Sequence, residues 1–333
     1  MKTKKKEVRN ILVTGGAGFI GTHLCTKLLE LGFKVYAIDN FATSKRSNIT
    51  NLLKNKNFSF FENTIMNRPL MDKLIKKCDM VYHLAAAVGV KYILQYPLES
   101  LLTNLNGTEN VLEFADKYSK KVIITSTSEV YGKHGKTLFK EDDDAIFGST
   151  KLLRWSYAEA KAIDEFLALA YFKQRKLPIV IVRLFNTVGP LQLGAYGMVL
   201  PRLIQQAIAN KPLTVYGTGE QTRTFTYIDD VVGAMIALGF EKKCIGEVFN
   251  IGNYDAISIK DLALKIKKAT KCRASIKYVS YEKAYGKFSD EFEDMMCRIP
   301  DIRKIHKAIG YMPHYNIDQI IKKTIEYFKD KEK

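Results

Sequence analysis

Short apolar runs and amphipathic segments alternate along the chain from residue 10 to residue 185. The apolar runs lie at 10–14, 34–39, 57–61, 79–87, 121–132 and 177–185, and they have the length of buried strands. A helical spacing of apolar residues follows several of them, most clearly over 98–118 and 151–172. Strands that alternate with helices of this length predict an α/β fold with a doubly wound parallel sheet.

The pattern becomes irregular after residue 185. The run NTVGPLQLGAYGMVLP holds three glycines and two prolines, which predicts that the chain leaves the sheet there. A helix over 203–209 and a strand over 213–217 are expected in a second, smaller lobe, whereas a helix from Asp229 and the strand 247–252 return to the first. The predicted large lobe is 1–185 with 227–252, and the predicted substrate-binding lobe is 186–226 with 253–333.

A glycine-rich turn follows the first strand and opens a helix. Its glycines are Gly15, Gly18 and Gly21. Glycine permits the tight turn and lets backbone amides approach a pyrophosphate, whose charge the helix N-terminus attracts. In this context the motif predicts a Rossmann-type dinucleotide-binding lobe.

Asp39 ends the second strand, eighteen residues after Gly21. A carboxylate at this point binds ribose hydroxyls and repels a 2′-phosphate, which favours NAD over NADP. Lys45 and Arg46 lie just downstream and keep NADP as the alternative. The other expected cofactor contacts are Phe19, Ile20, Asn40, Asn63, Ile65, Leu84, Ala85 and Ala86.

Tyr157 and Lys161 lie four residues apart in the segment 151–172, and therefore on one face of a helix. A nearby ammonium, together with a positively charged nicotinamide, favours the ionised form of a phenol, which then accepts a proton from a substrate hydroxyl. Chance also produces this spacing, as Tyr327 and Lys331 show. The first pair is favoured because a nucleotide-binding signature and a hydroxyl-rich strand end precede it.

That strand end reads Ser126, Thr127, Ser128, Glu129. Its hydroxyls are predicted to hold the substrate hydroxyl, and Glu129 supplies one carboxylate for a second proton step.

Composition limits the remaining possibilities. No apolar run approaches the length of a membrane span and the start lacks the apolar segment of a signal peptide, so we expect a cytoplasmic protein without a membrane partner. Five scattered cysteines without a CxxC favour reduced thiols over disulfides or a metal site. The net charge of +17 comes from lysines spread along the chain, which predicts no nucleic-acid partner.

Together, TGGAGFIG, Asp39, HLAA, STSEVYG, YAEAK, RLFNTVGP and PLTVYGTGEQTRTFTYIDD resemble the extended short-chain dehydrogenase/reductases that modify nucleotide sugars. The resemblance covers nearly the whole chain. It implies that a tightly held NAD oxidises the sugar at C4 and that the 4-keto sugar undergoes a second step. It also implies that Tyr157 is the base, that Lys161 lowers the pKa of Tyr157 and holds the nicotinamide ribose, and that Thr127 hydrogen-bonds the C4 hydroxyl.

The resemblance further implies a UDP-sugar substrate. The run PLTVYG is similar to the part of UDP-sugar enzymes that pairs with uracil, and Arg223 matches an arginine that grips the pyrophosphate. A cation suits a dianion there. The expected substrate contacts are Tyr92, Ser128, Asn186, Leu200, Thr214, Tyr216, Arg223 and Arg298.

Thr-Ser-Glu at 127–129 most resembles the UDP-glucuronate decarboxylases, and RWSY and Arg298 agree with this. A C4 ketone makes the C5 carboxylate a β-keto acid that loses CO2 readily. Glu129 would manage protons near C5, and Arg298 would orient the carboxylate or bind phosphate. The run VGVKY, ending at Tyr92, instead resembles UDP-sugar 4-epimerases, which remain the alternative. Glucose-type 4,6-dehydratases are disfavoured because Ser128 replaces their aspartate.

A non-catalytic dinucleotide-binding protein is the rival from another class, and the presence of both Tyr157 and Lys161 argues against it. The family resemblance also implies a homodimer formed through the helices at 98–118 and 151–172.

Overall fold

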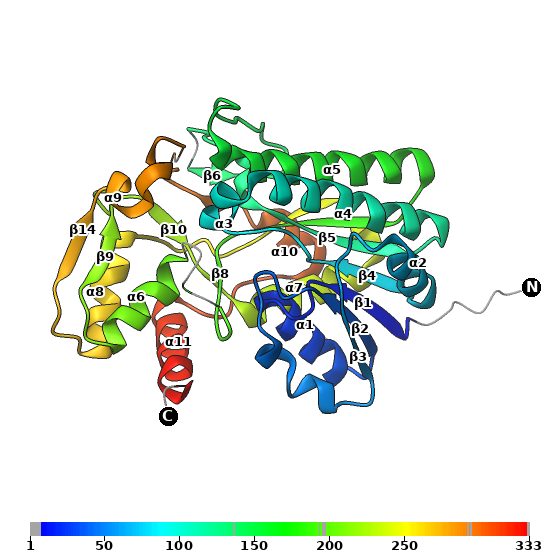
Figure 1. Ribbon diagram of the computed structural model, residues 1–333, viewed down its shortest axis with the longest axis horizontal. Helices are drawn as coiled ribbons and strands as arrows, with labels where there is room; N and C mark the ends of the chain where they lie inside the picture. Colours follow the sequence, from blue (N-terminus) through cyan, green and yellow to red (C-terminus); the bar gives the residue numbers. More distant parts are fainter. Residues whose placement is uncertain are drawn as a thin grey trace, which may run out of the picture.

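Figure 1 shows the computed structural model, which describes residues 8–331 except 136, 193, 195–197, 292 and 294. The predicted lobes include residues 1–7 and 332–333, which lie outside the described residues. No helix in the described ranges combines the length and the apolar character needed to cross a bilayer.

A seven-stranded parallel sheet forms the centre of the larger lobe, with the strand order β12-β7-β5-β4-β1-β2-β3. Its strands are β1 (Asn10–Thr14), β2 (Lys34–Asp39), β3 (Phe58–Glu62), β4 (Met80–His83), β5 (Lys121–Thr127), β7 (Ile179–Leu184) and β12 (Val248–Ile251). Strand order changes direction between β1 and β4, which opens a crevice at the carboxyl ends of these strands. The predicted doubly wound sheet is confirmed.

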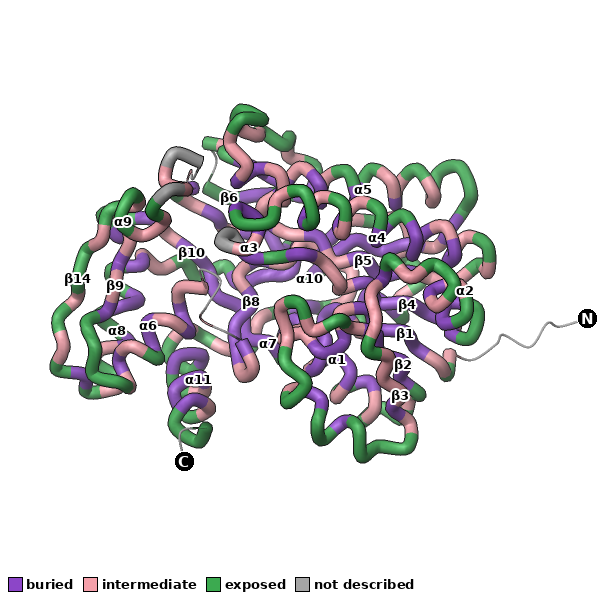
Figure 2. Tube along the Cα trace, viewed as in Figure 1, coloured by how far each residue is buried: buried purple, intermediate pink, exposed green. Residues whose placement is uncertain are grey.

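Helices cover both faces of this sheet (Figure 1). One layer holds α2 (Arg68–Lys77), α4 (Pro97–Lys117) and α5 (Ser156–Arg175), and the other holds α1 (Phe19–Glu30), α7 (Ile228–Phe240) and α10 (Arg303–Ile309). Alternate residues of each strand therefore enter two separate cores: Ile11 and Val13 belong to one, and Leu12 to the other. Figure 2 shows the buried strands between the two helical layers.

Two strands are shorter than their apolar runs. The run 79–87 pairs only as far as His83, which lies opposite Thr14 at the end of β1, and the following residues turn into the crevice. The run 121–132 ends as a strand at Thr127 and continues as the 3-10 turn η3 (Ser128–Tyr131). Both strand ends therefore deliver their next residues to the crevice rather than to the sheet.

The smaller lobe packs helices against a short parallel pair of strands, β9 and β14. Its elements are α6 (Val199–Ile208), β9 (Leu213–Tyr216), β10 (Thr222–Thr224), β13 (Ala256–Ser258), α8 (Ile259–Thr270), β14 (Ile276–Val279), α9 (Tyr281–Tyr285) and α11 (Ile317–Lys331). Shorter elements lie elsewhere along the chain: α3 (Val90–Gln95), β6 (Leu138–Phe139), η4 (Leu153–Trp155), β8 (Thr187–Val188), β11 (Thr226–Tyr227) and β15 (Ile299–Pro300).

The chain crosses between the lobes once more than the sequence indicates. β15 pairs with β6 of the large lobe, and α10 packs against β12 and α7. Residues 299–309, expected in the small lobe, therefore lie against the large one. This return brings Arg298 to the crevice.

Candidate active site

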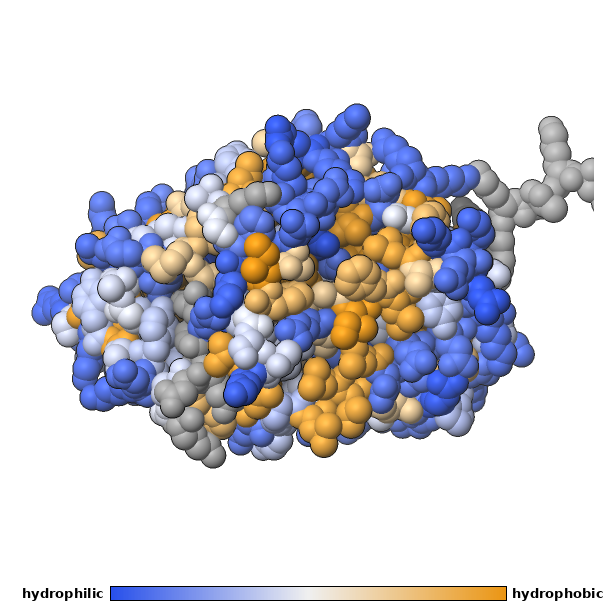
Figure 3. Space-filling model, turned by 90° about the horizontal axis from the view of Figure 1, so that it is seen from above, coloured by the Kyte–Doolittle hydropathy of each residue, from blue (hydrophilic) through white to orange (hydrophobic). Residues whose placement is uncertain are grey.

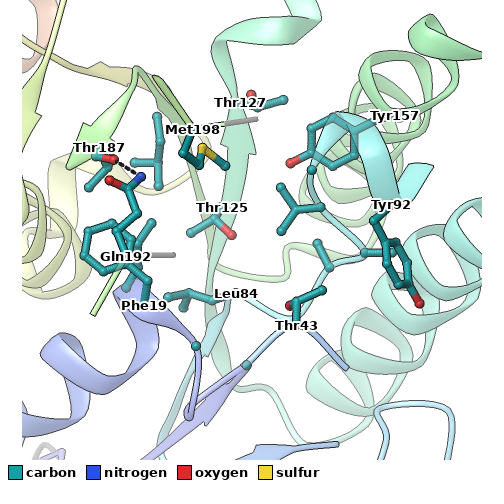
Figure 4. Close-up of a pocket in the computed structure, with 18 of the residues that line it drawn as sticks. Phe19, Thr43, Leu84, Tyr92, Thr125, Thr127, Tyr157, Thr187, Gln192 and Met198 are labelled. Carbon is teal, nitrogen blue, oxygen red and sulfur yellow. Dashed lines mark hydrogen bonds between the residues drawn. The ribbon is translucent and has the colours of Figure 1, made fainter. Parts of the chain in front are cut away.

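One cavity of about 520 Å³ lies where the carboxyl ends of the strands face the small lobe. A volume of this order suits a cofactor or a small-molecule substrate. All of the predicted site residues line it except Lys161 and Thr214. Figure 4 shows the hydroxyl of Tyr157 pointing into this cleft from one side, with Phe19 and Gln192 on the opposite side.

The glycine-rich turn brings β1, α1 and β4 into close contact. A Cβ at Gly21 would lie 2.0 Å from the carbonyl oxygen of Gly15, and a Cβ at Gly15 would lie 2.8 Å from the backbone nitrogen of Ala85. Gly15 also has a φ of +69°, a conformation that side chains disfavour. The turn therefore requires glycine, and its open backbone fits a pyrophosphate at the start of α1.

Asp39 organises the loop after β2. One carboxylate oxygen accepts from the backbone N–H of Ala17, and the other accepts from the N–H of Phe41 and the hydroxyl of Ser44. The carboxylate thus lies at the edge of the glycine turn, as the ribose of a bound dinucleotide requires. Arg46, the cation that left NADP open, forms an exposed ion pair with Glu62 instead of lining the cleft.

Tyr157 lies in the first turn of α5, half-buried, with its hydroxyl in the cleft. Burial raises the pKa of Tyr157, and the carboxylates of Glu129 and Asp164 raise it further. The sequence-based expectation was the opposite, a pKa lowered by Lys161. The difference arises mainly because burial disfavours the charged phenolate, and also because the ammonium of Lys161 is bound to a carboxylate.

Lys161 is turned beneath the floor of the cleft. Its ammonium donates to a carboxylate oxygen of Asp164 at 2.8 Å, and both side chains are almost completely buried. Asp164 lies three residues further along α5, on the same helical face. The structure therefore adds a third residue to the predicted Tyr157–Lys161 unit, because the carboxylate of Asp164 binds the ammonium of Lys161.

Glu129 lies between two buried arginines. Arg154 donates to one oxygen of Glu129 at 2.6 Å, and Arg298 donates to the other at 2.7 Å. Arg298 also donates to the side-chain oxygen of Asn186. Two guanidinium groups therefore enclose one carboxylate at the wall of the cleft.

This cluster fixes the ionisation state of Glu129. Burial alone would raise the pKa of the carboxyl, but the charges and hydrogen bonds of Arg154 and Arg298 outweigh burial and hold the pKa of Glu129 well below its usual range. The sequence suggested that Glu129 handles protons. In the structure it is an ionised group without a proton to donate.

The hydroxyls of the strand end have different partners. Ser126 donates to Glu165 behind the cleft, where Glu165 also binds Arg183. Thr127 accepts from the backbone N–H of Glu129. Ser126 therefore helps to support β5. Thr127 remains the residue predicted to hydrogen-bond the C4 hydroxyl of the substrate.

The family can now be assigned. Residues 12–324 match the family described as GDP-mannose 4,6 dehydratase. The chain belongs to this family. The family resemblance and the fold drawn from the sequence motifs are thereby confirmed.

Relatives and solved structures cover the chain almost completely. UDP-N-acetyl-alpha-D-glucosaminuronate decarboxylase of Bacillus cytotoxicus is 41% identical over 97% of this chain and 98% of its own length. UDP-glucuronic acid decarboxylase 1 of Xenopus tropicalis is 33% identical over 98% of this chain and 73% of its own length. The crystal structure of UDP-glucuronic acid 4-epimerase from Bacillus cereus, with UDP-glucuronic acid and NAD, has a TM-score of 0.86 and 35% identity over 96% of this chain and 99% of that one.

In this member of the GDP-mannose 4,6 dehydratase family, the small lobe supplies cationic and aromatic groups to the cleft. Arg223 is buried and donates to the carbonyl of Thr222, and Tyr216 stacks on the guanidinium of Arg202 at 3.8 Å. Thr214 does not line the cleft, and the side chain of Gln206 binds both the N–H and the hydroxyl of Thr214. A substrate contact through the polar groups of Thr214 would require these hydrogen bonds to break.

Sequence reasoning missed two arginines of this site. Arg154 stands in the run RWSY, three residues before Tyr157, and its pairing with Glu129 was not predicted. Arg202 follows Pro201 in α6, and its Nε and Nη1 atoms are buried without a hydrogen-bond partner among the described residues. The sequence signal that could have found Arg154 is an arginine in the run RWSY, three residues before Tyr157.

Proposed function

We propose that the protein is an NAD-dependent decarboxylase of a UDP-uronate that works through oxidation at C4. The observation that carries this proposal is the Arg154–Glu129–Arg298 cluster, which places two guanidinium groups in the cleft with Thr127 and Tyr157. A guanidinium group such as that of Arg298 suits a carboxylate at C5, which a neutral sugar lacks. The decarboxylases among the relatives support the same reaction class.

NAD fits the large-lobe side of the cleft. The glycine turn receives the pyrophosphate, Asp39 the adenosine ribose, and Leu84 to Ala86 flank the path toward Tyr157. When bound, NAD supplies the hydride acceptor for C4, and its reduced form supplies the hydride for the return step. The complex of the Bacillus cereus epimerase with NAD supports this cofactor.

Tyr157 acts on the C4 hydroxyl. Thr127 hydrogen-bonds that hydroxyl, and the phenolate of Tyr157 takes its proton while the hydrogen on C4 leaves as hydride. The positive charge of oxidised nicotinamide favours the phenolate and offsets the raised pKa of Tyr157. The product of this step is a ketone at C4.

The ketone makes the second step easy. The bond between C5 and its carboxylate breaks, CO2 leaves, and the electron pair is delocalised onto the oxygen at C4. A proton from water then adds to C5 in the place that the carboxylate has left. Arg298 orients the carboxylate of the substrate. Glu129 is ionised and holds Arg298 and Arg154 in place. Its negative charge also weakens the attraction of the two arginines for the substrate carboxylate, so that CO2 can leave.

The small lobe binds the UDP portion. Arg223 meets the diphosphate, and Tyr216 contacts the base from β9. UDP-glucuronate and its 2-acetamido counterpart share every group used in these steps, so both are substrates to compare.

The proposal is tested by incubating the purified protein with NAD and each of these two UDP-uronates. Release of CO2 with formation of the matching UDP-pentose supports it. Rapid inversion at C4 with the carboxylate retained overturns it in favour of a 4-epimerase. The second candidate has its own support, since the Bacillus cereus epimerase structure superposes over almost the whole chain.

A second copy of the chain is the partner we infer for the outer face of α4 and α5. Figure 3 looks onto this side of the molecule and shows apolar residues gathered there. Phe166 is 74% exposed and Leu98 69% exposed, and Leu102 and Ile163 are also exposed on the same helices. Exposed apolar side chains grouped on two long helices favour a self-complementary interface.

We infer a cytoplasmic location from the thiols. All five cysteines are free, and four of them are buried. Unpaired cysteines are typical of a reducing compartment. Recovery of the tagged protein in the soluble cytosolic fraction of its host would support this inference, and recovery outside the cell would contradict it.

A further inference from the structure

Asp164 is a buried carboxylate that the mechanism above does not use. It lies on α5, is 1% exposed, and binds the ammonium of Lys161 through one oxygen. Its other oxygen, Oδ1, has no hydrogen-bond partner among the described residues. Burial raises the pKa of Asp164, and the ammonium of Lys161 opposes that rise.

A polar chain leads from the cofactor side of the cleft to this pair. The hydroxyl of Thr14 accepts from the N–H groups of Leu84 and Ala85, so its own proton is donated to Nδ1 of His83. His83 must then donate from Nε2 to the hydroxyl of Thr108. Thr108 lies close enough to Asp164 to favour its ionised form.

The charges around Tyr157 can be summed from these contacts. β4 contributes His83, which is neutral because burial and Lys161 lower its pKa to about 3. α4 contributes the neutral Thr108 and also Glu99, which lines the cleft and accepts from the hydroxyl of Tyr92. η3 contributes ionised Glu129, which is paired with Arg154 of η4 and with Arg298 before β15. On α5 itself, the cation of Lys161 is matched by the anion of Asp164.

We infer that Asp164 is a positioning residue that holds Lys161 in a buried ion pair, withholds its positive charge from Tyr157, and so sets the pH at which Tyr157 acts as a base. The role of Tyr157 as base rests on the proposed function. The ionisation of its phenol does not, because it can be measured in the protein without any substrate.

The first test measures phenolate absorbance during alkaline titration. Subtracting the curve of a Tyr157→Phe protein isolates Tyr157 from the other tyrosines, and the same subtraction is made in an Asp164→Asn background. We expect the Tyr157 phenolate to appear only above the ordinary tyrosine range in the wild-type background, and its midpoint to fall by about one unit or more after Asp164→Asn. Identical difference curves in both backgrounds would overturn the inference.

Glu165→Gln is the matched control. Glu165 is the next residue of the same helix and is also buried, but its partners are Arg183 and Ser126. It should leave the titration of Tyr157 unchanged, and an equal shift would mean that any buried carboxylate has this effect, which contradicts a specific role for Asp164. Asp164→Ser serves as the second variant if Asp164→Asn does not fold.

The second test is the pH profile of turnover with NAD and UDP-glucuronate. Loss of the Asp164 charge should move the acidic limb to lower pH by about one unit, a tenfold gain in the ionised fraction on that limb. An unmoved limb contradicts the inference. If no UDP-uronate is turned over at any pH, the proposed function fails, while the phenolate titration still decides the role of Asp164.

Discussion

Glu129 and Arg298 are 169 positions apart in the sequence, and their charged groups lie 2.7 Å apart at the wall of the cleft. Glu129 arrives at the end of β5, and Arg298 arrives on the segment that returns from the small lobe before β15. Arg154 completes the cluster from the turn before α5. The cluster is therefore assembled from three separate parts of the chain.

Glu129→Gln should destabilise the protein in a pH-dependent way. Because the folded pKa of Glu129 is lowered, its carboxylate contributes stability above the unfolded value of about 4.3, and this contribution is lost as the pH falls toward the folded value. The difference in unfolding free energy from wild type should be about 1–3 kcal/mol near neutral pH and should narrow below about pH 4. Urea denaturation at several pH values measures it.

The control for this prediction is Glu113→Gln. Glu113 also binds an arginine, Arg68, but both side chains are roughly half exposed. Surface pairs contribute little. If the difference in unfolding free energy between wild type and Glu129→Gln stays constant down to about pH 3.5, this would contradict the lowered pKa of Glu129.

Tyr157→Phe should reduce turnover of UDP-glucuronate by about 10²–10⁴-fold, because the phenyl ring cannot accept the C4 proton. The chain provides its own control. The hydroxyl of Tyr327 lies 3.4 Å from the ammonium of Lys331 on α11, with the same spacing in sequence and outside the cleft. Tyr327→Phe should keep full activity, and equal loss in both variants would show that the spacing alone was misleading.

Arg154→Gln should lower the affinity for UDP-glucuronate relative to UDP-glucose, because it removes one of the two guanidinium groups that enclose Glu129 and makes the site less positive. A loss of tenfold or more in the ratio of the two dissociation constants is expected, about 1.4 kcal/mol. Arg183→Gln is the control: Arg183 is bound to Glu165 but does not line the cleft. It should change thermal stability without changing that ratio.

Gly21→Ala should abolish NAD binding, because the added methyl would lie 2.0 Å from a backbone oxygen of the glycine turn. Equilibrium dialysis or calorimetry with NAD measures the loss. Gly233→Ala is the control, since a Cβ at this α7 position meets nothing within 4 Å. That change should leave binding intact and increase helix stability by up to about 1 kcal/mol.

Phe166→Glu should convert the inferred dimer to a monomer, measured by light scattering across a range of protein concentrations. A charge on this apolar face opposes its own copy across a two-fold interface. Leu264→Glu places the same charge on α8, where the side chain is 48% exposed and outside the patch. A monomeric wild-type protein would overturn the inference directly.

The central sheet could be predicted from the sequence because each buried strand leaves a local apolar run. The ends of these strands could not be predicted, because β4 and β5 end where the strands paired with them end. The partner of Lys161 was also beyond local reasoning: Tyr157 and Asp164 both lie on its helical face, and only the packing of α5 against β5 and α4 decides between them. The pairing of Arg154 with Glu129 and of Thr214 with Gln206 could not be predicted for a similar reason, because these partners lie on other elements.

The return of the chain to the large lobe has a consequence for how the molecule loses its structure. The edge strand β12 and the covering helix α10 come late in the sequence, and one hydrophobic cluster runs from Ile11 through Leu200 to Ile320. Neither half retains a complete interior when cut from the other. Denaturation should therefore proceed as one cooperative transition, and a fragment ending at residue 185 should not fold alone.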